Sequence, residues 1–101
     1  MSYIVTVHGM LKGKDEKASR QLHDNAAAQA RAIGKSLGNI SHHAYINPDN
    51  PKEFFDIDRW DDNLEGLKKF FSDPGMAKAI GELFEAPPEI RIYEDKGWLE
   101  W

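Results

Sequence analysis

The stretch of residues 54–83 constrains the fold most, because it predicts a strand that leads directly into a helix broken in its middle. Side chains at every second position of a strand point to the same face of the sheet. One face of this strand therefore carries two aromatic and two acidic residues, namely Phe54, Asp56, Asp58 and Trp60. We expect Asp56 and Asp58 to pair with Arg91 or with lysine side chains.

The helix after this strand is predicted in two segments. Asp62 and Glu65 have the spacing of a capping box, so the first segment should begin there. Apolar residues then recur at helical spacing as far as Pro74, which suits the first turn of a helix and not its interior. The apolar positions of the two segments are Leu64, Leu67, Phe70, Phe71, Ala77, Ile80, Leu83 and Phe84.

The remaining sequence predicts three more strands and one more helix. The helix carries an alanine-rich apolar stripe and ends at Gly38, and a turn over residues 47–51 joins two strands as a hairpin. The predicted elements, in order, are a strand over residues 3–11, a helix over 15–37, strands over 40–47 and 54–60, the broken helix, and a strand over 89–94.

The order β-α-β-β-α-β predicts an α+β fold of the ferredoxin-like, split βαβ kind, with residues 1–101 as a single domain. Both helices should cover one face of an antiparallel four-stranded sheet. Val5 and Val7, or their alternates, would then lie on an uncovered face. Two such faces packed together with C2 symmetry would form a dimeric α+β barrel. The apolar tail from Trp98 to Trp101 should likewise dock on its own domain or on a partner subunit.

Composition excludes several classes of function. The chain has a formal net charge of −4 and no basic face, so we expect no nucleic-acid partner. It has no cysteine, and therefore neither disulfides nor a thiolate nucleophile. No apolar run approaches the length of a membrane span, and the first eleven residues lack the features of a signal peptide. We expect a cytoplasmic protein.

The most distinctive motif is the strand end from Asp58 to Asp62, an acid-x-Trp sequence followed by a polar cap, with the Ser72-Asp73-Pro74 break after it. In these motifs, and in the order and length of nearly all its elements, the chain resembles the antibiotic biosynthesis monooxygenase (ABM) domain of the dimeric α+β barrel superfamily. The resemblance implies a homodimer, an apolar pocket between helices and sheet, and oxygenation of phenolic substrates without metal or flavin.

Two departures from this family affect the expected chemistry. Many relatives carry histidines where this chain has Lys69 and Gly75. The haem-degrading branch of the superfamily ligates iron through a helix histidine, and the matching residues 76–80 contain none. We therefore expect no haem degradation by that route, and no cofactor. The missing histidines favour, as an alternative, a barrel that binds a ligand without chemistry.

Candidate site residues follow from this picture. His8 or His43 would take a phenolic proton, because histidine titrates near neutral pH. His42 and His43 are neighbours on a strand, so they face opposite sides and one of them reaches the pocket. His8 and Trp60 also have plainer interpretations. His8 could be a half-buried histidine with one hydrogen bond, and Trp60 could anchor the following helix. The candidate substrate-binding residues are Thr6, Tyr45, Trp60, Lys69, Phe71 and Met76.

The four histidines show none of the spacings of metal ligands, and the aspartates form no EF-hand, so we expect no metal. The predicted function is a cofactor-independent monooxygenase acting on a small aromatic, quinol-like substrate in an apolar helix–sheet pocket. Two alternatives stay open: a non-catalytic dimeric barrel that binds a small apolar or aromatic ligand, and an isomerase or lyase on the same fold.

Overall fold

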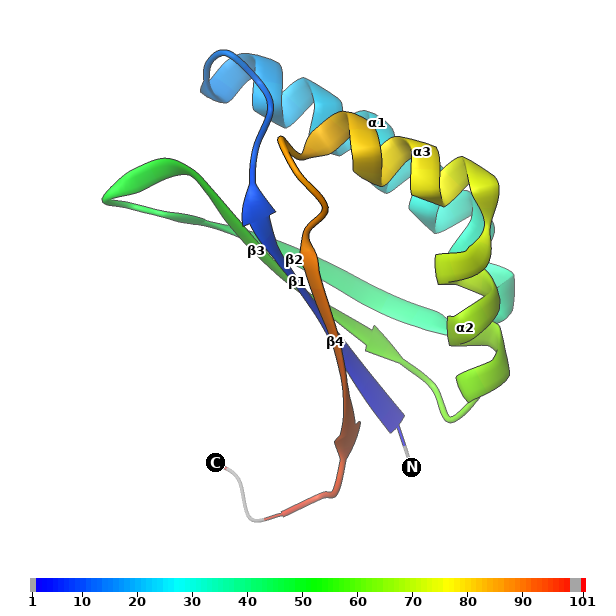
Figure 1. Ribbon diagram of the computed structural model, residues 1–101. Coiled ribbons are helices and arrows are strands. Elements are labelled where there is room, and N and C mark those ends of the chain that lie inside the picture. Colours follow the sequence, from blue (N-terminus) through cyan, green and yellow to red (C-terminus); the bar gives the residue numbers. More distant parts are fainter. Residues whose placement is uncertain (1, 99–100) are drawn as a thin grey trace.

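In the computed structural model, which describes residues 2–98 and 101, a four-stranded antiparallel sheet carries the helices on one of its faces (Figure 1). The strand order is β2-β3-β1-β4, so the predicted α+β, ferredoxin-like class is confirmed. The elements are β1 (Ser2–Met10), α1 (Glu16–Gly34), the 3-10 turn η1 (Lys35–Leu37), β2 (Asn39–Asn47), β3 (Asn50–Trp60), α2 (Leu64–Ser72), α3 (Pro74–Leu83) and β4 (Glu89–Asp95).

The helix break lies where the sequence predicts it. The Asp73 side chain accepts from the Met76 backbone N–H at 3.0 Å, and Pro74 occupies the first turn of α3. The start of α2 differs from the prediction. Asn63, and not Asp62, is the cap, because its side chain accepts from the Gly66 N–H at 3.0 Å.

The two faces of the sheet have different compositions. The predicted alternation of β3 is confirmed: Phe54, Asp56, Asp58 and Trp60 are all buried. In β1, Val5 and Val7 pair with Asp58 and Asp56, so they also lie beneath the helices. The uncovered face of β1 is therefore formed by the alternate residues, which include Ile4, Thr6 and His8.

The core lies between the sheet and the helices. Trp60 and Leu67 are almost fully buried, and the Trp60 ring meets Phe70 edge to face at a centroid distance of 5.0 Å. Such burial explains why the broken helix holds its place on the sheet: each large side chain contributes about 1.5–3 kcal/mol when removed from water. Trp60 is thus the helix anchor of the plainer interpretation.

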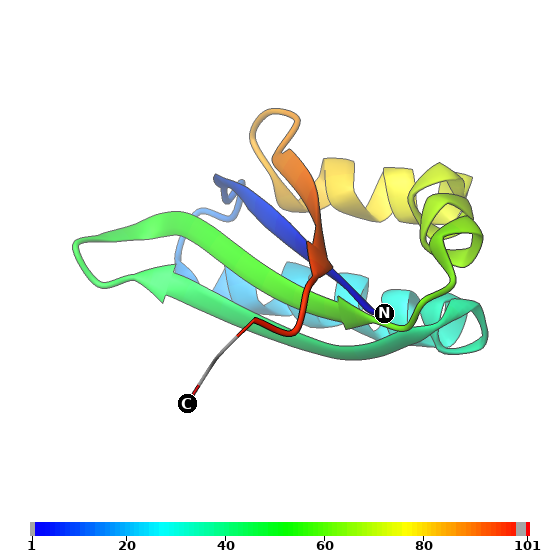
Figure 2. The same cartoon turned by 90° about the horizontal axis from the view of Figure 1, so that it is seen from below.

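No helix covers the opposite face of the sheet, as the view from below shows (Figure 2), and this face is partly apolar. Tyr45 and Phe55, which pair across β2 and β3, are exposed there, and Met10 and Tyr93 are exposed on the neighbouring strands. Trp98 is 81% exposed, so this part of the tail does not dock on its own domain; residues 99 and 100 lie outside the described residues. None of the described helices has the length and apolar character to span a membrane.

Candidate functional site

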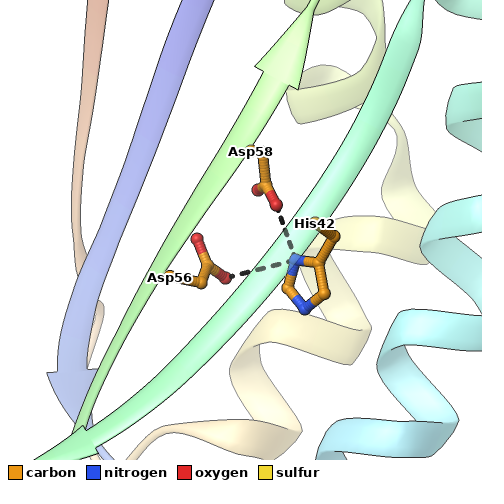
Figure 3. A group of neighbouring side chains, drawn as sticks. All are labelled: His42, Asp56 and Asp58. Atoms are coloured by element: carbon orange, nitrogen blue, oxygen red, sulfur yellow. Dashed lines mark hydrogen bonds and ion pairs between the residues drawn. The ribbon is translucent and has the colours of Figure 1, made fainter. Parts of the chain in front are cut away.

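A polar cluster of three side chains lies on the helix-facing side of β2 and β3 (Figure 3). Asp56 and Asp58 alternate on β3, and His42 of β2 pairs directly with Asp58. The Nδ1 atom of His42 lies 2.5 Å from Oδ1 of Asp58 and 3.8 Å from Oδ2 of Asp56. Two adjacent strands thus hold an imidazole and two carboxyl groups against the core.

Helix α1 adds a second histidine to this cluster. Nε2 of His23 lies 2.9 Å from Nε2 of His42, and the two rings are stacked with a centroid distance of 5.2 Å. On its other side, Nδ1 of His23 lies 3.0 Å from Oδ1 of Asp24. A continuous chain of contacts therefore joins Asp58 to Asp24.

The environment changes the protonation of the buried members. Burial, followed by repulsion from Asp58, raises the pKa of Asp56 to about 8. Oδ1 of Asp56 is buried and has no hydrogen-bond partner among the residues that the structure describes. The hydrogen bond to Asp58 raises the pKa of His42 despite its partial burial. A carboxyl group that keeps its proton near neutral pH can act as an acid or a base there.

Two hollows lie near the cluster. A small cavity of about 60 Å³ lies between the sheet, the alanine face of α1 and α3, and the four polar residues His23, His42, Asp56 and Asp58 line part of it. A larger apolar groove of about 750 Å³ lies between α2, α3 and β4. Phe71, Ile80 and Phe84 line both hollows, so these side chains form the wall between them.

The cluster is also a possible metal-binding group, because one ligand atom from each of His42, Asp56 and Asp58 lies within 4.8 Å of the others. Two ligands of one ion at about 2.1 Å stand about 3 Å or more apart. The 2.5 Å between Nδ1 and Oδ1 is shorter than that and is a hydrogen-bond distance. His42 and Asp58 are thus spaced as a hydrogen-bonded charge pair. Their side chains would have to move apart to hold a cation.

The residues proposed from sequence divide between the two faces. His8, His43, Thr6 and Tyr45 lie on the uncovered face, where His8 makes a single 2.8 Å contact with Glu53. Trp60 is buried in the core, and Lys69 is exposed on α2. Only Phe71 and Met76 of the proposed set line the small cavity.

His42 is therefore the member of the His42–His43 pair that reaches the space beneath the helices. The expected partners of the two aspartates were wrong. Arg91 lies on the other face of the sheet, since it pairs with Thr6, and its Nε contacts Glu89 at 2.8 Å. The actual partner of Asp58 is His42. Sequence reasoning gave no role to His23, although it lies on the apolar stripe of α1, one residue from Leu22.

Solved structures of low sequence identity share this fold. SnoaB, a cofactor-independent oxygenase from Streptomyces nogalater, has a TM-score of 0.70 at 15% identity, over 94% of this chain and 93% of that one. A protein from Nitrosomonas europaea assigned to the antibiotic biosynthesis monooxygenases has a TM-score of 0.71 at 13% identity, over 94% and 90%. A conserved protein from Methanosarcina mazei has 0.71 at 17%, over 95% and 94%. No family model and no curated protein matches the sequence.

Proposed function

We propose that this chain, which has an ABM-like fold, is an oxygenase that acts on a small phenolic substrate without an added cofactor. The single observation behind the proposal is the buried acid of the cluster: burial raises the pKa of Asp56 to about 8 beside a cavity that apolar side chains also line. A phenol must lose its proton to become an electron-rich anion that reacts with oxygen. Similarity to a cofactor-independent oxygenase supports the same reaction class.

The substrate would bind in the apolar groove between α2, α3 and β4. At about 750 Å³ the groove falls within the usual range of about 300–1,000 Å³ for small-molecule sites. An aromatic ring placed there lies against Phe71, Ile80 and Phe84, on whose other side the polar cluster begins. Rotation of the Phe71 ring would open this wall and let the hydroxyl group of the substrate reach Asp56.

The residues of the chain would then have separate roles. Asp56 in its ionised form accepts the phenolic proton through its unpartnered Oδ1, and protonated His42, whose pKa the hydrogen bond to Asp58 raises, balances the negative charge of the phenolate. The apolar wall excludes water and positions the ring, so that the anion meets oxygen in a dry site. His8 and His43 have no part in this chemistry.

We further propose that the active form is a homodimer. The uncovered face carries Tyr45, Phe55, Met10 and Tyr93, and an apolar sheet face of this kind is stabilised by packing against a second copy. Symmetric packing would place His8 and His43 in the interface and away from the cavity.

The test is turnover of a panel of hydroquinones and naphthols in air and under nitrogen. We expect oxidation only in air, and a loss of at least about 100-fold in the Asp56→Asn variant, the lower range for a missing general base. His43→Gln, on the other face of the same hairpin, is the matched control and should keep its activity. Equal turnover under nitrogen would instead support an isomerase or lyase, and tight binding of these compounds without turnover would support a binding protein.

A further inference from the structure

We propose that Asp58, His42, His23 and Asp24 form a path that carries protons between the buried cavity and solvent. The path rests on the proposed function in one respect: it gives the proton of the substrate a route out of the site. Its existence can be measured without any substrate. The path as a whole crosses from β3 through β2 to α1, so no single element contains it.

The path is continuous from Asp58 to Asp24. The three contacts of the path measure 2.5 Å between Asp58 and His42, 2.9 Å between the two Nε2 atoms, and 3.0 Å between His23 and Asp24. All three lie within hydrogen-bond range. Asp56 stands beside the inner end on the same strand face, with the unpartnered Oδ1. No water is needed to bridge the four residues.

The path leads from buried carboxyl groups to solvent. The side chains of Asp56 and Asp58, at the inner end, are 9% and 12% exposed. His42 and His23 are 34% and 19% exposed, and Asp24 at the outer end is 56% exposed. The path therefore begins at the most buried acids of the cluster and ends at a carboxylate in contact with solvent.

Proton transfer along the path balances at every step. A transfer begins when Asp58 has taken up a proton from the cavity, while His42 carries its hydrogen on Nε2 and His23 carries its hydrogen on Nδ1. Asp58 gives its proton to Nδ1 of His42, Nε2 of His42 gives its proton to Nε2 of His23, and Nδ1 of His23 gives its proton to Asp24. Both imidazoles are neutral before and after, and Asp24 releases the proton to water. Exchange of the rings with solvent restores the starting tautomers.

The charges around the path favour this direction. The hydrogen bond to His23 lowers the pKa of Asp24, which therefore passes its proton on to water readily. Arg20 of α1 contacts Asp24 at 3.5 Å, and Glu16 lines a hollow of about 340 Å³ with His23. Arg31, further along α1, lines a hollow of about 200 Å³ with His42 and Asp58. Arg20 and Arg31 act on the histidines through fixed positive charges, whereas Glu16 and Asp56 are neighbours whose own titration would also affect them.

The experiment measures how fast the proton held between Asp58 and Nδ1 of His42 exchanges with water, by NMR of the ¹⁵N-labelled protein. We expect exchange to slow at least about tenfold in His23→Gln, because glutamine fills the site and donates hydrogen bonds but cannot pass a proton through. Asp24→Asn leaves both imidazoles in place and removes only the outer acceptor, and we expect slowing there too. His43→Gln is the control and should exchange at the rate of the unaltered protein.

Unchanged or faster exchange in both His23→Gln and Asp24→Asn would overturn the path. So would a stoichiometric Zn²⁺ complex that is lost in His42→Ala, because a bound ion would occupy the acceptor atoms of Asp58. If no phenol is turned over but exchange slows as expected, the proposed function fails and the path stands. If phenols are oxidised but exchange is insensitive to both variants, only the path fails.

Discussion

His42 of β2 lies directly opposite Asp58 of β3, and its Nδ1 atom is 2.5 Å from the Asp58 carboxylate. The pair is held by the backbone ladder of two strands, so its geometry does not depend on the position of a flexible loop. A charged hydrogen bond of this kind contributes about 1.5–3 kcal/mol when it is made in a partly buried site.

Removing His42 should destabilise the protein although the imidazole is itself partly exposed. His42→Ala leaves two buried carboxyl groups without their partner, and an unpaired buried group costs about 1–3 kcal/mol. We expect a lower free energy of unfolding by that amount in urea titrations at pH 7. His43→Ala, one residue away on the uncovered face, should change it by no more than about 0.5 kcal/mol. Equal effects of the two substitutions would contradict the assigned role of the Asp58 pair.

Stability should fall as the pH rises from about 4 to about 8. The pKa of Asp56 is near 3.8 unfolded and about 8 folded, so in this window the folded state holds a proton that the unfolded state has lost. By linkage, the free energy of unfolding then decreases with pH, by at most about 1.4 kcal/mol per unit for one proton. The raised pKa of His42 acts in the same direction above its ordinary value of 6.5.

The measurement compares urea unfolding at pH 5.5 and pH 8 for the unaltered protein and for Asp56→Asn. Asparagine does not titrate, so the loss of stability between the two pH values should be smaller in the variant. Groups that do not interact with Asp56 contribute equally to both proteins, so the difference reports Asp56 together with the part of the His42 pKa shift that Asp56 causes. The same pH dependence in both would mean that Asp56 ionises normally in the folded chain.

Filling the cavity should abolish phenol oxidation without unfolding the protein. Ala27 of α1 lines both the cavity and the neighbouring hollow beside His42. Ala27→Leu adds three carbon atoms in a tightly packed space, at a cost of about 1–3 kcal/mol. We expect a folded protein that no longer oxidises phenols, with unaltered circular dichroism. Ala28→Leu, on the exposed side of the same helix turn, is the matched control and should retain activity.

A charge on the uncovered sheet face should produce monomers. Phe55 is exposed there beside Tyr45, and Phe55→Arg would bury an unpaired charge at both symmetry-related positions of the interface. Sedimentation velocity should show a dimer for the unaltered protein and a monomer for the variant. Lys69→Glu, on the exposed surface of α2, should leave the mass unchanged. A monomer in the unaltered protein at micromolar concentration would contradict the homodimer.

Much of the fold could be predicted from sequence because the periodicities are strong. The alternation of β3 and the Asp73–Pro74 break lie where the sequence places them. The start of α2 was missed by one residue because Asp61, Asp62 and Asn63 can all cap a helix. Only the structure shows which one accepts the Gly66 N–H.

The cluster could not be predicted in the same way, because its members come from three elements. Sequence alone shows that His42 and His43 face opposite sides, but choosing between them requires the register of the hairpin. Asn47 pairs with Asn50, and a regular ladder would then pair Ile46 with Pro51. Ile46 pairs instead with Phe54, a shift of an odd number of positions that exchanges the two faces of β2. Nothing in the pattern of β2 itself reveals this shift.

The irregularity between Ile46 and Asn47 thus decides which imidazole meets Asp58. Without the irregularity, Asn39 would stand opposite Asp58, and His42 would point away from the helices. The acid–base properties of the interior therefore depend on where this hairpin breaks its register, and a hairpin without the break would need different residues to build the same chemistry.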